Sequence, residues 1–206
     1  VKRPLPAGTI KPIEALIFAI ILGVMAVILF LAFFNFLSAL LSLGTIVYYS
    51  FFYTLYLKPR TPYNVVIGSA AGSMAPLIAW AAARGEIGLA PVILSAIIFF
   101  WSPAHFWSLA LYLKKDYERT GQPMMPIIKG DTETRMQILL YTFWTVAVSI
   151  AYLFAGGRLF YLIASITLGI YFIIRSILFN KTGTDIGARR FFRFSIIYYQ
   201  IPLNFR

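Results

Sequence analysis

The sequence has no cysteine, only one histidine and few charged residues. Without cysteine the chain forms no disulfide, builds no thiolate metal site and offers no cysteine nucleophile. Charged residues make up 12% of the chain and hydrophobic residues 60%, whereas a soluble domain carries about 25% charged residues. The mean hydropathy is +0.81, and several apolar runs exceed the roughly 20 residues that cross a bilayer as a helix. This composition predicts an integral membrane protein.

Six apolar segments are long enough to span the membrane. They cover residues 12–33, 36–57, 64–83, 89–113, 136–156 and 159–179. A spanning segment must satisfy its own backbone hydrogen bonds, and long apolar runs do so as helices. A seventh apolar segment begins near Phe191 but meets Pro202 before it could span. No linker interrupts the pattern, so we predict an all-α, polytopic transmembrane helix bundle in which residues 1–206 form a single integral-membrane domain.

Basic residues are concentrated in every second connection between the apolar segments. Fourteen lie on one side of the predicted bundle: Lys2, Arg3, Lys11, Lys58, Arg60, Lys114, Lys115, Arg119, Lys129, Arg135, Lys181, Arg189, Arg190 and Arg193. Only Arg84 and Arg158 lie in connections on the other side. This asymmetry follows the positive-inside rule, so we predict a plasma-membrane protein whose basic connections are cytoplasmic. Topology thereby explains the net charge of +11, and we expect no nucleic-acid partner.

The only histidine, His105, lies inside the fourth apolar segment. If that helix continues to its basic end, Asp116 follows on the same face, because eleven residues make three turns plus about 20°. Trp101, Ser108 and Tyr112 fall on the same stripe at helical spacing. Ionisable groups at this depth usually face a cavity and serve a function. The alternative is a neutral histidine bonded to a neighbouring helix, and the residues alone leave both interpretations open.

The polar segment KKDYERTGQPMMP that follows mixes acids with bases. Asp116 and Glu118 offer hard carboxylate oxygens of the kind that suit Mg²⁺, which usually binds one or two carboxylates plus phosphate oxygens. Lys114 and Arg119 could hold the rest of a diphosphate. The alternative is a solvated loop whose bases only obey the charge asymmetry.

Two further pairs of basic residues stand beside prolines on the same side of the membrane: Lys2 and Arg3 in VKRPLP, and Lys58 and Arg60 in YLKPRTPYN. The prolines restrict the backbone and could hold these side chains over the mouth of a pocket. As ordinary interface anchors, the same residues would need no such explanation. The stretch GSAAGSMAP (68–76) is a small-residue face suited to close helix packing, with a proline that could open a kink.

Five stretches of the chain resemble heme O synthase, the protoheme farnesyltransferase family of the UbiA-type intramembrane prenyltransferase superfamily. They are RPLPAG (3–8), LKPRTPYNVVIG (57–68), WSPAHFWSLAL (101–111), DYERTGQPMMPIIKG (116–130) and FRFSIIY (192–198). They occur in the family's order across nearly the whole chain. The histidine segment followed by the Asp-Tyr…Pro-Met-x-Pro loop is specific to this branch, whereas quinone-type relatives would be expected to carry Asp-x-x-x-Asp there.

The resemblance implies a nine-helix bundle with a lateral, lipid-open cavity that two cytoplasmic polar loops cap. By that comparison the chain holds family helices three to eight, lacks the first two, and departs from the final helix after Tyr199. It has no initiator Met, and the acidic motif that normally precedes Arg-Pro-Leu-Pro is absent. Lys115 stands where family members often carry a second acid. We therefore expect the chain to be N-terminally incomplete.

The resemblance also implies a reaction and a set of roles. The reaction is Mg²⁺-dependent transfer of a farnesyl group from farnesyl diphosphate to the vinyl group of heme B, which gives heme O. Asp116 and His105 would be catalytic, and Asp116 with Glu118 would bind the metal. The residues expected to bind diphosphate are Lys2, Arg3, Lys58, Arg60, Lys114 and Arg119, and those expected to face the heme are His105, Trp101 and Tyr112. Whether His105 ligates iron, bonds a propionate or acts as a base stays open.

The expected partners are membrane lipid, the two substrates, and heme A synthase or oxidase assembly proteins. Two alternatives compete with this interpretation. One is a UbiA-type enzyme for a quinone precursor or another aromatic acceptor, and the other is a non-catalytic subunit that holds heme or lipid in the same cavity. The convergence of acidic and basic residues in the cytoplasmic loops favours an enzyme, because a non-catalytic subunit would need no diphosphate clamp.

Single cysteines in this cysteine-free chain can test the predicted topology. Cysteines at Thr61, Gln122 and Thr182 should all react only from the cytoplasmic side, because each lies in or beside a basic connection. The measurement is labelling of intact cells with a membrane-impermeant thiol reagent, before and after permeabilisation. Labelling of any of the three from outside would overturn the predicted orientation.

Overall fold

The structure is a computed structural model that describes residues 4–5 and 7–204, with side chains described up to Tyr199. Within that part of the chain, six helical segments are long and apolar enough to cross a membrane, so the chain is a multi-pass membrane protein. They are α1 (Pro12–Phe33), α2 (Phe36–Val47) continued by the π-helix η1 (Tyr48–Leu57), α3 (Asn64–Gly72) with α4 (Ala75–Arg84), α5 (Leu89–Tyr112), α8 (Asp131–Ala151) continued by η2 (Tyr152–Ala155), and α9 (Leu159–Thr182). Each of the six predicted segments is confirmed, with small shifts at the ends.

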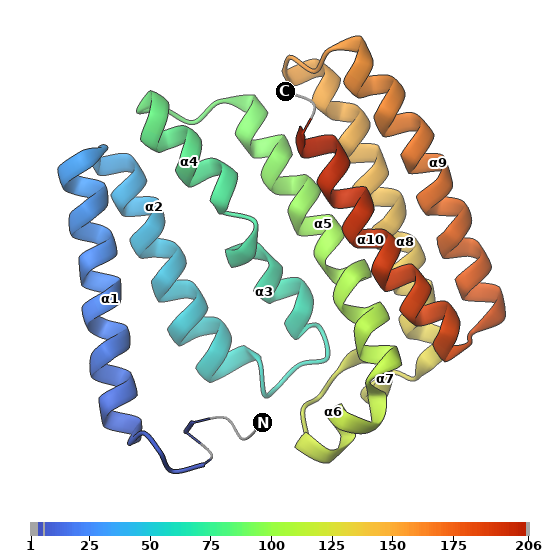
Figure 1. The fold of residues 1–206 in the computed structure, drawn as a ribbon, viewed down its shortest axis with the longest axis horizontal. Coiled ribbons are helices and arrows are strands. Elements are labelled where there is room, and N and C mark those ends of the chain that lie inside the picture. The colour runs from blue at the N-terminus through green and yellow to red at the C-terminus, as the bar shows by residue number, and fades with distance from the viewer. Residues whose placement is uncertain (1–3, 6, 205–206) are drawn as a thin grey trace.

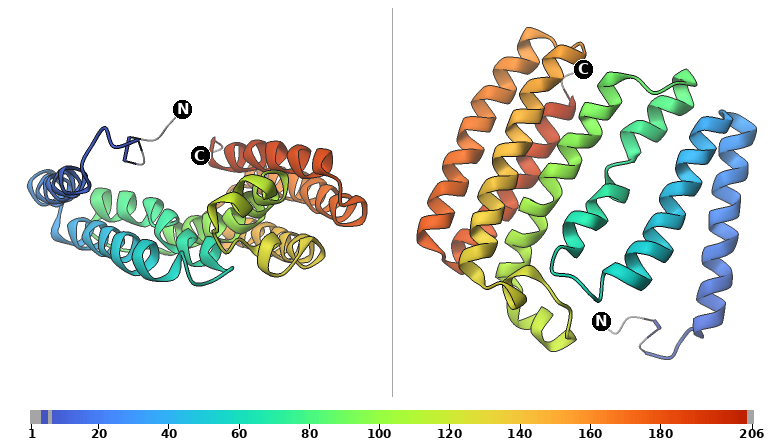
Figure 2. Two further views of the ribbon diagram at one scale, coloured as in Figure 1. Left: turned by 90° about the horizontal axis from the view of Figure 1, so that it is seen from below. Right: turned by 180° about the vertical axis from the view of Figure 1, so that it is seen from behind.

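Helices α1 to α4 follow one another on one side of α5, and α8, α9 and α10 (Asp185–Asn204) form a group on its other side, in which α10 packs between α5 and α9 (Figures 1 and 2). Helix α5 contacts α3, α4, α8 and α10, while α1 packs only on α2 among the extensive helix contacts. No residue of α1 is buried, whereas α5 buries half of its most apolar stretch. Helix α5 is therefore the central element, and α1 offers its apolar surface to the membrane.

The polar connections gather at one end of the bundle, the lower end in Figure 1. The turn after η1, the short helices α6 (Lys114–Thr120) and α7 (Met125–Ile128), and the α9–α10 turn all lie there. The connections after α1, α4 and η2 lie at the opposite end. The connections rich in basic residues therefore lie at one end of the bundle and the others at the opposite end, as the charge pattern predicts.

Helix ends follow the local chemistry of the sequence. The side chain of Asn35 caps α2 by accepting a hydrogen bond from the Ser38 backbone N–H at 2.9 Å. Its amide nitrogen donates to the Ala81 carbonyl at 2.7 Å, which ties the start of α2 to the end of α4. Gly85 and Gly183 adopt positive φ values of 73° and 60° just after α4 and α9, a conformation that glycine tolerates best.

Several connections differ from the sequence-based expectation. The expected polar connection 180–190 is only the turn 183–184, because α9 continues to Thr182 and α10 begins at Asp185. The seventh segment thus starts before Phe191 and continues past Pro202, and it is not among the helices suited to span a membrane. The expected loop 114–135 contains α6, α7 and the first turn of α8.

Two spans are irregular. The third predicted segment breaks near its middle, between Gly72 and Ala75, beside Pro76, the residue that could open a kink there. The second ends in the ten-residue π-helix η1, and π-type turns are rare and often occur at functional sites. Nothing in the sequence indicated η1, because its apolar and aromatic residues also suit an ordinary α-helix.

The core lies where α5, α8, α9 and α10 meet. Its largest fully buried side chains include Trp107, Ile138, Phe172, Phe191 and Tyr198. The Phe172 ring stacks on both Phe191 and Tyr198, with centroid distances of 5.2 and 4.5 Å. Aromatic packing of this kind holds α10 against α9 beside the more polar contact that α10 makes with α5.

Helices α8 and α9 pack closely together at Gly169. A Cβ added there would lie 2.6 Å from Val146 Cγ1. We expect Gly169→Ala to lower the free energy of unfolding by about 1–3 kcal/mol, because the branched valine side chain cannot yield without a backbone shift. Thermal unfolding of the purified protein in detergent measures the change.

Two further variants complete that test. The double variant Gly169→Ala, Val146→Ala should be more stable than Gly169→Ala alone, because the clashing methyl groups are gone. Gly23→Ala is the matched control, since its Cβ would meet only Ile46 Cγ2 at an ordinary 3.9 Å. A Gly169→Ala protein as stable as Gly23→Ala would contradict the packing argument.

Candidate functional site

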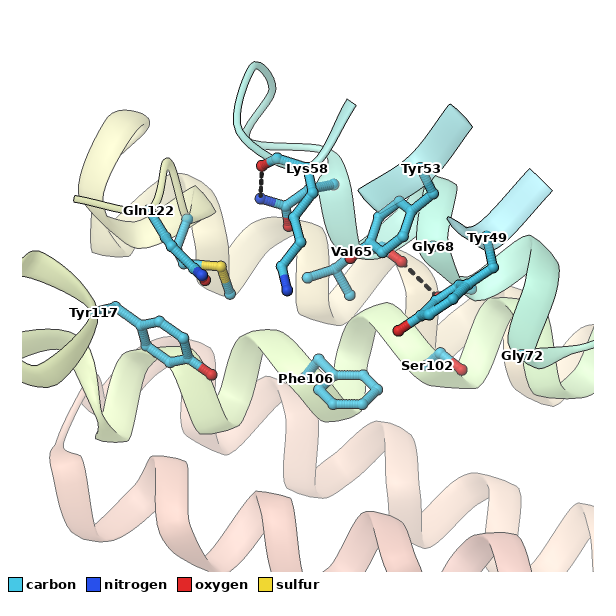
Figure 3. Close-up of a pocket in the computed structure, with 13 residues that line it drawn as sticks. Tyr49, Tyr53, Lys58, Val65, Gly68, Gly72, Ser102, Phe106, Tyr117 and Gln122 are labelled. Carbon is cyan, nitrogen blue, oxygen red and sulfur yellow. Dashed lines mark hydrogen bonds between the residues drawn. The ribbon is translucent and has the colours of Figure 1, made fainter. Parts of the chain in front are cut away.

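A cavity of about 350 Å³ lies at the polar end of the bundle. Its walls come from η1, α3, α5 and α6, together with the segment that connects α6 to α7 (Figure 3). The lining residues are Tyr49, Tyr53, Lys58, Asn64, Val65, Gly68, Ser69, Gly72, Ser102, Phe106, Tyr117, Gln122 and Met124. This volume is within the range of about 300–1,000 Å³ typical of small-molecule sites.

The polar mouth of the cavity is formed by both connections that flank it. Among the described residues that line the cavity, Lys58 is the only charged one, and Gln122 faces it from the opposite connection (Figure 3). Asn64 is buried and joins the two connections, because its amide nitrogen donates to the carbonyls of Lys58 and Pro123, each at 3.4 Å. The mouth therefore carries the positive charge of Lys58 beside two segments that Asn64 holds together.

Four aromatic side chains contribute to the cavity wall. The rings of Tyr49 and Tyr53 stack along η1 with a centroid distance of 5.1 Å, and Phe106 and Tyr117 contribute from α5 and α6 (Figure 3). The Tyr53 ring lies directly on Gly68, where an added Cβ would meet the ring at 2.7 Å. The small-residue face expected to serve only helix packing thus also makes room for a wall residue of the cavity.

The acidic residues predicted to bind a metal do not converge. Asp116 and Glu118 are both exposed and do not line the cavity, although Tyr117 between them does. Residues two positions apart on a helix point about 200° apart. Among the described residues, no three histidine, cysteine, aspartate or glutamate side chains are grouped so that they could hold a metal ion. Asp116 and Glu118 therefore do not form a Mg²⁺ site by themselves.

Most of the predicted diphosphate-binding residues also lie away from the cavity lining. Lys114 donates to Asp131 Oδ1 at 2.7 Å and so joins α6 to the start of α8. Arg119 lies 4.0 Å from Asp116 in an exposed pair, a kind of contact that contributes little. Arg60 donates to the Tyr56 carbonyl at 3.0 Å and covers the Tyr56 ring.

Of the members of that predicted set that the structure describes, only Lys58 lines the cavity. Lys2 and Arg3, which were also predicted to bind diphosphate, lie outside the described residues.

The predicted stripe from His105 to Asp116 is interrupted. Helix α5 ends at Tyr112, and Leu113 has φ −102° and ψ 23°, outside regular helical geometry. Helix α6 then starts in a different direction (Figure 1). The shared face of His105 and Asp116 depended on one helix continuing through residue 116, and this condition is not met. The apolar segment itself ends where it was predicted to end, within one residue of 113.

The upper part of the stripe forms the contact between α5 and α10. Trp101 stacks on His105 with a ring distance of 4.4 Å, and the indole N–H of Trp101 donates to the Ser195 carbonyl at 2.8 Å. Tyr112 lies lower on the same face, where the Arg189 guanidinium is 5.7 Å from its ring centroid. Tyr112 lines a separate cavity with Arg189, Arg190 and Arg193, so the structure does not bring it together with His105.

Phe106 connects the two regions. It lines the cavity, and its ring meets the neighbouring His105 ring edge-on at 5.2 Å. His105 itself is not part of the cavity lining. The histidine therefore stands one aromatic ring behind the cavity wall, on the side that faces α10.

Sequence reasoning missed most of the residues that build the cavity. Tyr49, Tyr53 and Phe106 lie in apolar runs that any spanning helix could contain, and only the helix phase shows which of them turn inward. Asn64 and Gln122 could have been recognised as candidate lining residues, because both are uncharged polar residues within the stretches YLKPRTPYN and KKDYERTGQPMMP.

Comparisons with known proteins identify the family of this chain. A family model described as the UbiA prenyltransferase family matches residues 1–197. The chain belongs to the UbiA prenyltransferase family. No solved structure matches it.

Among its curated relatives are three proteins named protoheme IX farnesyltransferase. The relative from Azoarcus sp. (strain BH72) is 44% identical and that from Gloeothece citriformis (strain PCC 7424) 43% identical, and each match covers 95% of this chain. The relative from Azorhizobium caulinodans is 43% identical over 96% of the chain. The matches cover 66%, 62% and 66% of the three relatives in that order, so the UbiA-family chain spans less than two thirds of their length.

Proposed function

We propose that this chain forms most of a protoheme IX farnesyltransferase, in which a farnesyl group is transferred from farnesyl diphosphate to heme B. The observation that carries the proposal is the cavity with one lysine at its polar mouth and aromatic rings on its inner wall. Membership of the UbiA family and the names of the relatives support the same reaction.

The lysine and the rings suit the two halves of a prenyl diphosphate. The ammonium group of Lys58 is a compact positive charge that can donate hydrogen bonds to diphosphate oxygens. The rings of Tyr49, Tyr53, Phe106 and Tyr117 offer apolar area to the isoprenoid chain. Their electron-rich faces also attract a cation by about 0.5–2 kcal/mol each, which suits an allylic carbocation.

The proposed reaction balances without an oxidant or a reductant. The allylic C–O bond breaks, and its electron pair leaves with the diphosphate. The π electrons of the heme vinyl group form the new C–C bond to the farnesyl carbon. The cation that results beside the porphyrin takes up water and loses a proton, which gives the hydroxyethylfarnesyl group of heme O. The protein contributes charge stabilisation, positioning and exclusion of water until the C–C bond has formed.

We place the acceptor beside the contact between α5 and α10. Phe106 separates this region from the cavity by one ring, so a donor in the cavity and a planar acceptor near His105 would be neighbours. Trp101 extends the aromatic surface on the same face. Heme A synthase or oxidase assembly proteins, which would use the membrane-bound product, are proposed partners, and the plasma membrane with cytoplasmic basic connections is the proposed location.

Mg²⁺ is the proposed cofactor, although the described acids do not form a site for it. Mg²⁺ requires near-octahedral oxygen ligands, and Asp116 could supply only part of that set. We propose that further carboxylates come from segments that the relatives have and the matched region does not include. No step of the reaction above is assigned to the metal.

Substitution of Lys58 tests the assignment of the cavity mouth. Lys58→Met should raise the KM for farnesyl diphosphate about 10- to 100-fold, because a hydrogen bond to a charged group contributes roughly 1.5–3 kcal/mol. Steady-state kinetics of heme O formation by the full-length protein measure the change. Lys115→Met is the matched control, since Lys115 is exposed and does not line the cavity. Equal effects of the two substitutions would remove Lys58 from the binding site.

The incomplete metal site leads to a prediction for residues 1–206 alone. Expressed in a strain that lacks its own heme O synthase, the 206-residue chain should form no heme O. A chimaera that adds the segments of the Azoarcus relative outside the match should form it, because those segments supply the missing ligands and cavity wall. Chromatography of extracted hemes provides the measurement.

Asp116→Asn in the active chimaera extends the same experiment. It should lower turnover about 10²–10³-fold, by analogy with the loss of one electrostatic stabiliser. It should also raise the Mg²⁺ concentration that gives half-maximal activity. Comparable heme O from the short chain would contradict the need for further ligands. Prenylation of a different aromatic acceptor in place of heme would contradict the proposed substrate.

A further inference from the structure

The imidazole of His105 is clamped on both faces. Trp101 stacks on one face at a ring distance of 4.4 Å and Phe192 of α10 on the other at 4.5 Å, with interplanar angles of 18° and 25°. Tyr199 continues the stack beyond Trp101 at 4.6 Å. A ligand can therefore reach His105 only through the edge of the ring, where its two nitrogen atoms lie.

One of those two nitrogens is already paired. His105 Nδ1 lies 2.8 Å from Ser195 Oγ, and both residues are buried. Ser195 Oγ also donates to the Phe192 carbonyl at 2.7 Å. A hydroxyl group has one proton, and that proton is used by the carbonyl. Both contacts are hydrogen bonds only if His105 Nδ1 carries a proton and donates it to Ser195.

This assignment determines the chemistry of the other nitrogen. In a neutral imidazole one nitrogen carries the proton and the other keeps a lone pair in the ring plane. With the proton on Nδ1, the lone pair is on Nε2. A neutral His105 then cannot donate a hydrogen bond from Nε2 to a propionate, so the role as a propionate contact is disfavoured. An iron ligand and a base both use such a lone pair.

Ser195 also fixes the position of the ring. Its carbonyl accepts the indole N–H of Trp101 at 2.8 Å, so the two side chains that α5 directs to α10 both bond to the same residue. Histidine ligands of metals usually donate their second ring N–H to a partner that fixes tautomer and orientation. The Ser195 hydroxyl stands in that place.

We propose that Ser195 is a positioning residue that holds the His105 proton on Nδ1 and thereby presents Nε2 to the iron of a metalloporphyrin acceptor. Base catalysis would use the same lone pair along the same in-plane approach, and the spectrum of bound heme distinguishes the two roles. The proposal depends on the proposed function only in the identity of the acceptor. The tautomer and the role of Ser195 can be measured without turnover.

The single histidine makes the tautomer directly observable. When the 206-residue chain is labelled with ¹⁵N-histidine in lipid nanodiscs, its only imidazole gives one pair of nitrogen resonances. We expect a protonated Nδ1 and an unprotonated Nε2 in the wild-type chain. The reverse assignment would overturn the proposal, whatever the substituted proteins do.

Heme titration of the full-length protein tests the ligand. Ferric heme B should give the absorption and paramagnetic resonance spectra of an imidazole-bound iron, and His105→Ala should abolish them. Ser195→Ala should weaken heme binding about 10- to 100-fold, the usual effect of removing such a supporting partner. Ser195→Thr, which keeps the hydroxyl, should recover most of the affinity.

Tyr198→Phe is the matched control for a merely structural effect. Tyr198 lies about one turn after Ser195 on α10, and the substitution removes its hydrogen bond to Ser149 Oγ of α8 without touching His105. Its heme spectra should equal those of the wild type. Equal weakening by Tyr198→Phe and Ser195→Ala, or unchanged heme affinity in Ser195→Ala, would overturn the positioning role.

Activity measured in the same samples separates the two proposals. Heme O formation without an imidazole-bound iron spectrum would refute the iron ligand and leave the transfer reaction standing. An imidazole-bound iron spectrum without heme O formation would support the ligand and contradict the proposed function.

Discussion

The contact between α5 and α10 through Ser195 is the interaction on which the arrangement of the site depends. Trp101 and His105, one helical turn apart, both bond to this one residue across the interface. Away from water, a polar side chain without a partner is costly. The side chains of Trp101, His105 and Ser195 can all form their hydrogen bonds only at one axial position and one rotation of α10 relative to α5. This contact therefore sets the register of α10 against α5.

Most other buried hydroxyl groups are satisfied within their own helix. Thr142, Thr145 and Ser149 of α8 each donate to the carbonyl four residues earlier at 2.7–2.8 Å. Such bonds solve the desolvation problem but do not specify a neighbour. Interhelical hydrogen bonds in membranes contribute only about 0.6 kcal/mol each on average. Specific pairing therefore relies on close approaches such as Gly169 on Val146, combined with the few polar contacts that do cross between helices.

The sequence predicted the spanning segments well and the site only in part. Apolar runs end at charged or helix-breaking residues, so composition predicts their bounds, as Lys58 directly after η1 and Lys114 just after α5 show. The change of helix direction between α5 and α6 had no such mark. Apolarity also does not show which side of a helix faces which neighbour, so Tyr53 and Phe106 looked like ordinary membrane-facing residues. Among the predicted diphosphate-binding residues, Lys58 lines the cavity, whereas Lys114 and Arg60 form local contacts that charge patterning cannot foresee.

In the proposed reaction, the two faces of α5 would bring two substrates of different character to one helix. Ser102 and Phe106 turn toward the cavity, while Trp101 and His105 turn toward α10. A prenyl cation must meet its acceptor before it meets water, which requires adjacent sites with little polar surface between them. Phe106 belongs to both regions, because it lines the cavity and its ring contacts the imidazole of His105, and an aromatic ring at this position can stabilise positive charge. The break between α5 and α6 contributes to this arrangement. It turns the charged residues of α6 away from the face of α5 that carries His105, and Tyr117 is the side chain that α6 directs into the cavity.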